Sequence, residues 1–120
     1  MIYGIGVDIV HIPKFNKAVE KWGDRFKERV FTKSELEYCK NKGFSEQHLA
    51  VRFAAKEALF KALGKGMNFT DIEIINNEAG KPELNFKSPI SNLKSHITLS
   101  HDKDYCIAQV VLEDRNQTPR

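Results

Sequence analysis

The segment SEQHLAVRFAAKEALFKAL, residues 45–63, has the apolar spacing of a long helix. Large apolar side chains give this helix a broad apolar surface, at Leu49, Phe53, Leu59, Phe60 and Leu63. Alanines between them permit close packing, at Ala50, Ala54, Ala55, Ala58 and Ala62. Gly64 suits the position after the last helical residue, and Gly66 makes the following turn flexible. We therefore predict a helix from near Ser45 to Leu63 that another layer of the protein can approach closely.

The residues before this helix predict one strand and two further helices. Ile2–Val10 is mostly β-branched and apolar, which favours a strand, and Gly4 and Gly6 let another backbone or a ligand come close to it. Pro13 suits the first turn of a helix, whose apolar residues follow at helical spacing: Phe15, Val19 and Trp22. A capping box, Thr32-Lys33-Ser34-Glu35, begins a second helix that ends at Gly43.

The second half of the chain has the spacing of strands. We expect strands at Ile72–Ile75, Leu84–Phe86, Ile97–Ser100 and Tyr105–Leu112, completing one antiparallel sheet. Turn residues fill 76–82, and His101–Asp104 predicts a tight connection between the last two strands. These elements predict a single α+β domain over residues 1–120, with helices mostly first, the sheet mostly second and a frayed tail at 113–120.

Charge is distributed unevenly along the 120 residues, although the net charge is only +3. Residues 1–66 hold 13 Lys and Arg against 8 Asp and Glu, a balance of +5, whereas residues 67–120 have a balance of −2. A basic N-terminal half favours an anionic partner. Composition leaves open whether that partner is nucleic acid, a phosphate-rich cofactor or an acidic protein.

Two further features indicate a cytosolic protein. Apolar runs stay well below the roughly 18 residues of a membrane helix, and Met1–Asp8 lacks the basic start and cleavage site of a signal peptide. Cys39 and Cys106 form no metal-binding or redox spacing, so we expect two reduced thiols.

Several side chains could take part in chemistry, but each has an ordinary structural explanation when taken alone. Asp8 follows an apolar strand and could project into a cleft or simply into solvent. Glu57 and Lys61 share a helix face, as surface ion pairs often do. His101 follows a strand end, and the turn at Gly64 has no Walker-type pattern.

Taken together, three segments resemble the 4′-phosphopantetheinyl transferase family. They are Gly4-Ile5-Gly6-Val7-Asp8-Ile9-Val10, Arg52-Phe53-Ala54-Ala55-Lys56-Glu57-Ala58 and Leu99-Ser100-His101. The short length, the Thr32–Leu36 element and Gly80-Lys81-Pro82 before a strand are similar to the single-unit group that modifies acyl carrier protein. The resemblance runs from Ile2 to Glu113 in the family's order. It implies an α+β fold that assembles as a homotrimer with active sites shared between subunits.

The resemblance also implies roles for individual residues. Asp8 and Glu57 match ligands of Mg²⁺, two hard oxygen donors that leave positions for water and a pyrophosphate. Lys61 matches a lysine that contacts phosphate and either stabilises charge or helps deprotonate the acceptor. Catalytic roles are implied for Lys61 and His101. Contacts with coenzyme A are implied for Arg52, Lys61, Gly64, Lys81, Pro82 and His101.

The implied reaction is transfer of the phosphopantetheine arm of coenzyme A to a serine of acyl carrier protein, in support of fatty acid biosynthesis. The acidic carrier would bind the basic side chains of the first helix, Lys14, Lys17, Lys21 and Arg25. Three positions depart from the usual pattern and alter the expected shape of the coenzyme pocket: His11, Phe60 and Lys65.

Two other functions are compatible with parts of the sequence. A small basic nucleic-acid-binding domain would explain the lysines, but the strands lack a pattern of exposed aromatic residues for base stacking. A metal-dependent phosphohydrolase would use Asp8, Glu57 and His101 without a protein acceptor. We expect neither nucleic acid nor a membrane as partner.

Overall fold

The computed structural model describes residues 1–87 and 92–115 of the chain. In chain order the elements are β1 (Ile2–His11), α1 (Ile12–Val30), α2 (Lys33–Lys40), α3 (Ser45–Leu63), the short 3₁₀ helix η1 (Phe69–Asp71), β2 (Ile72–Asn76), β3 (Pro82–Phe86), β4 (Leu93–Asp102) and β5 (Tyr105–Asp114). The expected α+β class is confirmed, and α3 has the predicted bounds.

The strands form two antiparallel sheets, where the sequence predicted one. β5 lies between β1 and β4 in a three-stranded sheet, while β2 and β3 pair only with each other. On the side of β2 that faces away from β3, the backbone amide of Ile74 donates a hydrogen bond to Glu35 Oε2 on α2 over 2.8 Å. Ile72 and Ile74 are buried. The small sheet is therefore held by the helices as well as by its own hydrogen bonds.

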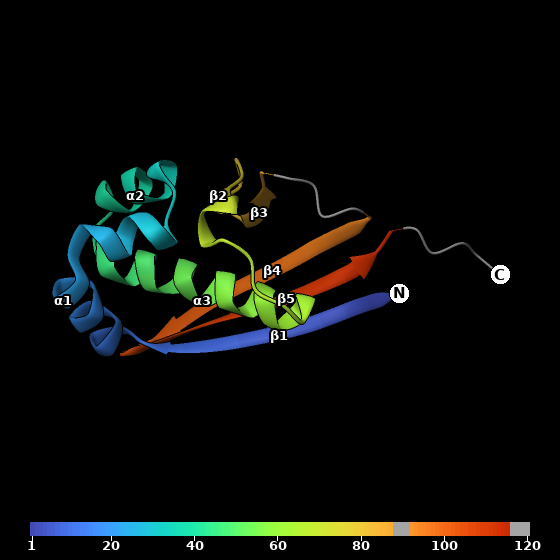
Figure 1. Ribbon diagram of the computed structural model, residues 1–120, viewed down its shortest axis with the longest axis horizontal. Coiled ribbons are helices and arrows are strands. Elements are labelled where there is room, and N and C mark those ends of the chain that lie inside the picture. Colours follow the sequence, from blue (N-terminus) through green and yellow to red (C-terminus); the bar gives the residue numbers. More distant parts are fainter. Residues whose placement is uncertain (88–91, 116–120) are drawn as a thin grey trace.

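Helix α3 covers one face of the three-stranded sheet, and α1 and α2 pack at one end of the molecule (Figure 1). The buried core lies between α3 and this sheet and includes Ala54, Ala58, Ala108, Val110 and Leu112. The opposite face of the sheet exposes large apolar side chains: Tyr3, Ile5, Val7, Ile9, Tyr105 and Ile107. Within the described residues, the sheet is thus covered on one side only.

The contact between β1 and α3 depends on two glycines. A Cβ atom on Gly6 would overlap the carbonyl oxygen of Ala58, and one on Gly4 would overlap that of Ala62. The expected close approach of another backbone to these glycines is therefore confirmed, and that backbone belongs to the alanine-rich side of α3.

The helix ends follow local sequence signals. Thr32 and Glu35 form both hydrogen bonds of the predicted capping box of α2, but the helix ends at Lys40 rather than at the expected Gly43. Gly64 ends α3 with φ at 82°, a conformation that glycine adopts without steric cost. Helix α1 is kinked at Gly23, where φ is 65°. Trp22, expected on the apolar side of this helix, is instead 61% exposed just before the kink.

Three expected boundaries near the C-terminus were wrong. β4 begins at Leu93 rather than at Ile97. His101 and Asp102 belong to β4, paired with Cys106 and Tyr105, so only Lys103 and Asp104 form the connection. A two-residue turn is sufficient to join antiparallel strands. β5 continues to Asp114, so the first two residues of the expected frayed tail pair within the sheet. Residues 116–120 of that tail lie outside the described residues.

No helix in the described part of the chain is long and apolar enough to cross a membrane.

Replacing Gly6 by alanine should destabilise the fold by about 3 kcal/mol or more, because the new methyl group meets backbone atoms that cannot move away freely. Gly43→Ala is the matched control, since nothing lies within 4 Å of the position of its Cβ. We expect the control to change the free energy of unfolding by less than about 0.5 kcal/mol. Urea unfolding measures both variants, and equal effects would contradict the close contact.

Candidate active site

Two carboxylates that the sequence places far apart lie together where α3 crosses β1. Asp8 is on β1, two residues beyond Gly6, and Glu57 is on α3, one residue before Ala58. Burial raises the pKa of Glu57, and the negative charge of Asp8 raises it further, while Lys61 opposes the shift. Two carboxylates that repel each other in a partly buried position favour the binding of a cation.

Lys61 lies at the same place but pairs with a different partner from the one expected. Its ammonium Nζ is 3.0 Å from Asp8 Oδ1 and donates to the carbonyl of Val7 over 2.9 Å. The sequence suggested a surface pair between Lys61 and Glu57 on the same helix. The close packing of β1 on α3 brings Asp8 within reach of Lys61. The spacing of residues along the helix could not indicate this pair, because Asp8 belongs to another element.

The carboxylate pair fits a hard divalent cation. Asp8 and Glu57 supply two oxygen donors, which is the ligand type that Mg²⁺ prefers. Within residues 1–87 and 92–115 there is no cluster of three or more His, Cys, Asp or Glu side chains suited to a metal. Water and a bound phosphate group would therefore have to complete the coordination of Mg²⁺.

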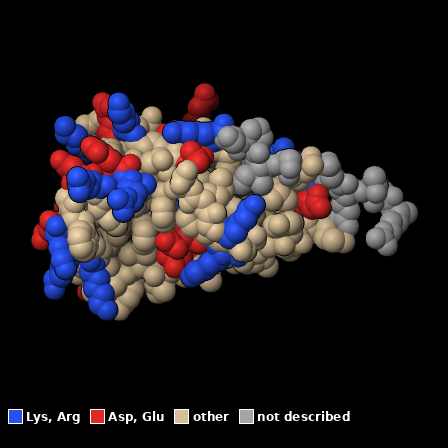
Figure 2. Space-filling view, in the orientation of Figure 1, with Lys and Arg blue, Asp and Glu red and all other residues tan. Residues whose placement is uncertain are grey.

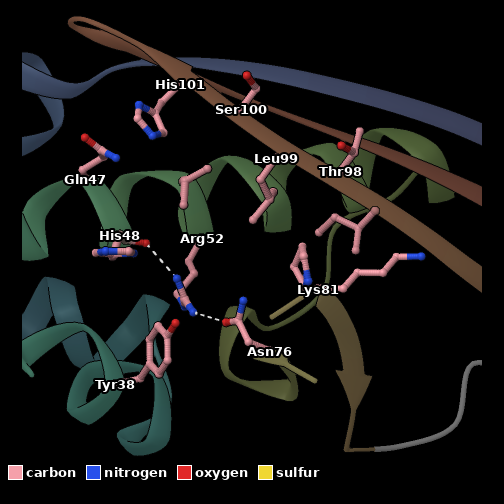
Figure 3. Close-up of a pocket in the computed structure, with 13 residues that line it drawn as sticks. Tyr38, Gln47, His48, Arg52, Asn76, Lys81, Thr98, Leu99, Ser100 and His101 are labelled. Carbon is pink, nitrogen blue, oxygen red and sulfur yellow. Dashed lines mark hydrogen bonds between the residues drawn. The ribbon is translucent and has the colours of Figure 1, made fainter. Parts of the chain in front are cut away.

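A pocket of about 330 Å³ lies on the other side of α3, and its walls come from α2, α3, β4 and the turn between β2 and β3. Four of the residues predicted to contact coenzyme A line it: Arg52, Lys81, Pro82 and His101. Figure 3 shows Arg52 directed between Tyr38 and Asn76, with His101 on the opposite wall near Gln47. Gly64 lies outside this pocket, at the end of α3.

Arg52 is the only charged side chain of the pocket lining, as described, that is fully enclosed, with 3% of its surface exposed. Its guanidinium lies 4.5 Å from the ring centre of Tyr38 and donates to Asn76 Oδ1 over 2.9 Å and to the carbonyl of His48 over 3.3 Å. Its Nε is buried without a hydrogen-bond partner. Because these partners are neutral, the positive charge of Arg52 is available to an anion in the pocket.

The lining of the pocket, as described, is cationic, since it includes Arg52 and Lys81 and no Asp or Glu. Burial lowers the pKa of His48, and the nearby charges of Arg52, Lys42 and His101 lower it further. A phosphate-bearing ligand would bring the negative charge that this surface lacks.

Sequence reasoning missed Tyr38, His48 and Asn76, which complete the pocket. His48 could have been found, since it lies one helical turn before Arg52 on the same face of α3. Tyr38 and Asn76 could not, because they come from α2 and β2 and meet Arg52 only in the folded chain.

The carboxylate pair and the pocket occupy opposite sides of α3. Arg52 and Glu57 are five residues apart, which separates them by about 140° around the helix axis. The strand pairing also separates the carboxylate pair from the pocket. Ala108 on the central strand β5 pairs with Asp8 of β1 on one side and with Leu99 of β4, beside the pocket, on the other. One chain therefore holds the two halves of the predicted site without joining them.

The basic residues predicted to bind a partner are all exposed on α1: Lys14, Lys17, Lys21 and Arg25. Basic side chains gather at the end of the molecule that α1 and α2 form, with acidic side chains among them (Figure 2). Lys21 lies over the exposed ring of Trp22, 5.0 Å from its centre.

Comparison with known proteins identifies the class to which this fold and site belong. Residues 4–110 match the sequence model of the 4′-phosphopantetheinyl transferase superfamily. The chain is 45% identical to the holo-[acyl-carrier-protein] synthase of Geobacter sulfurreducens, over 94% of this chain and 98% of the relative. The chain thus belongs to the 4′-phosphopantetheinyl transferase superfamily. Within this superfamily, 45% identity over nearly the full length of both chains places the chain in the holo-[acyl-carrier-protein] synthase group.

Solved structures agree with this assignment. A holo-(acyl-carrier-protein) synthase from Bacillus anthracis, in complex with CoA (3′,5′-ADP), superposes with a TM-score of 0.83 at 38% identity, covering 95% of this chain and 98% of that one. The holo-[acyl-carrier-protein] synthase from Neisseria meningitidis gives a TM-score of 0.87 at 35% identity, with 95% and 100% covered.

Proposed function

We propose that this chain transfers the 4′-phosphopantetheine arm of coenzyme A to a serine of apo-acyl carrier protein, in the cytosol and in support of fatty acid biosynthesis. The observation that carries the proposal is the nearly full-length similarity to holo-[acyl-carrier-protein] synthases. The cationic pocket around Arg52 supports it, because coenzyme A carries several phosphates.

In the proposed reaction, the serine oxygen bonds to the β-phosphorus of coenzyme A while the bond from that phosphorus to the bridging oxygen breaks. The serine hydroxyl gives its proton to water, and adenosine 3′,5′-bisphosphate leaves with the bridging oxygen. The protein's part is to align the two substrates and to neutralise charge. No covalent intermediate with the enzyme is required, so the buried thiols of Cys39 and Cys106 take no part.

The residues on the β1 side of α3 would act on the pyrophosphate. Asp8 and Glu57 would hold Mg²⁺, which when bound supplies positive charge to the phosphate oxygens. Lys61 in its ammonium form donates hydrogen bonds and has no lone pair, so we assign it the stabilisation of charge rather than the role of base. His101 would contact the phosphate region of the coenzyme, and Arg52, Lys81 and Pro82 would hold its nucleotide end.

Removing either proposed metal ligand should abolish turnover. Asp8→Ala and Glu57→Ala each delete one of two anionic donors, and water does not replace the lost charge. The assay contains coenzyme A, Mg²⁺ and apo-acyl carrier protein, with mass spectrometry of the carrier as readout. Near-normal turnover of either variant at ordinary Mg²⁺ concentrations would contradict the assignment.

The same assay separates the proposal from its two alternatives. A phosphohydrolase would release product without the carrier, and a nucleic-acid-binding domain would leave coenzyme A unchanged.

The basic side of α1 is the proposed surface for the acidic carrier protein. Charges at such a surface mainly set the rate and register of encounter. Reversing Lys17 and Lys21 to Glu should raise the apparent KM for the carrier about tenfold, equivalent to about 1.4 kcal/mol. The KM for coenzyme A should stay nearly constant. Equal effects on both substrates would show that this surface serves another purpose.

We also propose that the chain assembles as a homotrimer in which one subunit completes the active site of its neighbour. Two observations support shared sites. The halves of the site lie on opposite sides of α3, and the uncovered face of the sheet exposes the apolar side chains of β1 and β5 that a second copy could bury. In this arrangement, Asp8 and Glu57 of one subunit would meet His101 of its neighbour.

Complementation tests the shared site. Inactive Glu57→Ala and His101→Ala proteins should partly restore activity when dissociated and reassembled together, because some interfaces then contain neither defect. The measured mass in solution should be that of a trimer. A fully active monomer would contradict the proposal, and so would mixed oligomers without recovered activity.

A further inference from the structure

A fully buried ion pair joins the helices to the small sheet, well away from solvent. Lys56 and Glu35 both have side chains with 0% exposure, and Lys56 Nζ lies 2.7 Å from Glu35 Oε1. The other two hydrogens of the ammonium go to the carbonyls of Val30 over 2.7 Å and Phe69 over 2.9 Å. Burial lowers the pKa of Lys56, and the charge of Glu35 opposes that shift. The ammonium is thus fully satisfied, by partners from three separate segments.

Glu35 is equally well satisfied. Besides Lys56, its Oε1 accepts from the amide of Thr32 over 2.9 Å, and its Oε2 accepts from the amide of Ile74 over 2.8 Å. One buried pair consequently connects the end of α1, the start of α2, the middle of α3, η1 and β2. Shifting any of these elements would break a hydrogen bond inside the protein, where water cannot replace it.

The elements joined by the pair are those that carry the candidate site. Glu57 directly follows Lys56 on α3, and Arg52 precedes it by about one turn. Tyr38 lies about one turn after Glu35 on α2, and Asn76 lies two residues after Ile74 on β2. Rotation of α3 would therefore move Glu57 relative to Asp8 and Arg52 relative to Tyr38 and Asn76.

Helix α3 approaches the sheet closely on its alanine-rich side. The side of α3 toward the sheet consists of small residues, among them Ala54, Ala58 and Ala62, and meets Gly4 and Gly6. Small side chains allow close approach but interlock less than large ones. The buried pair adds a directional contact to this packing and to that of the large buried side chains Leu49 and Leu59.

We propose that Glu35 and Lys56 are a positioning pair, which fixes α3 so that Glu57 faces Asp8 and Arg52 reaches Tyr38 and Asn76. The part concerning Glu57 and a cation rests on the proposed function. Buried ion pairs often contribute little net stability compared with apolar residues of similar size. The role that we assign to the pair is to define the geometry of the elements that it joins.

The test uses binding rather than turnover. The double variant Glu35→Gln/Lys56→Met removes both charges and nearly preserves volume. Mn²⁺ probes the carboxylate pair and is followed by electron paramagnetic resonance, while adenosine 3′,5′-bisphosphate probes the pocket and is followed by calorimetry. Below the melting temperature, we expect both dissociation constants to rise about tenfold or more, as for other residues that orient a metal site indirectly. Should this variant fail to fold, Glu35→Asp withdraws the carboxylate by one methylene while keeping its charge.

Two controls separate positioning from loss of stability and from failure of the proposed function. Ile72→Ala removes a fully buried side chain from β2 and should lower the melting temperature with both affinities nearly unchanged. Asp8→Ala should abolish Mn²⁺ binding only. If Asp8→Ala binds Mn²⁺ like the wild type, the metal assignment in the proposed function is wrong. If Asp8→Ala fails to bind but the folded pair variant keeps wild-type affinity for either probe, the positioning role is overturned.

Discussion

The backbone of β1 packs directly against α3, and most other features of the molecule depend on this contact. Gly4 and Gly6 have no side chain to hold the helix away, so the carbonyls of Ala62 and Ala58 lie where a Cβ would otherwise be. The same approach brings Asp8 beside Glu57 and within 3.0 Å of Lys61. It also fixes which side of α3 is left for the pocket around Arg52. A steric condition at two residues thus determines where the carboxylate pair and the pocket lie.

Charged side chains act differently in three parts of this fold because their burial and their partners differ. Lys56 and Glu35 are enclosed and satisfy each other and nearby backbone groups, so they are closed to ligands. Arg52 is nearly as buried but has neutral partners, which leaves its charge for an incoming anion. Asp8 and Glu57 are only partly buried and repel each other, which favours a cation. Burial and the choice of partner, rather than residue type, decide whether a charged side chain is closed to ligands or left to bind one.

The three-stranded sheet is covered by α3 on one face and exposes apolar side chains on the other. The helix that covers it also stands between the carboxylate pair and the pocket. Both features fit the proposed assembly, in which a second copy would bury the open face and bring its own half-site to the first. The local fold of one chain would then supply all the side chains of the reaction, and assembly would bring them together.

Local signals in the sequence were sufficient for much of the fold. The spacing of residues 45–63, the capping box at Thr32 and the glycines of β1 depend on neighbours within one turn or one strand. The helices, the start of α2, the end of α3 and the close contact at β1 could therefore be predicted. The residues of the carboxylate pair and four pocket residues were found through the family resemblance. Tyr38, Asn76 and the Glu35–Lys56 pair required the tertiary structure, as did the partner of Lys61, the separate β2–β3 sheet and the division of the site by α3. Each of these depends on the distance between elements remote in the chain, and packing alone sets that distance.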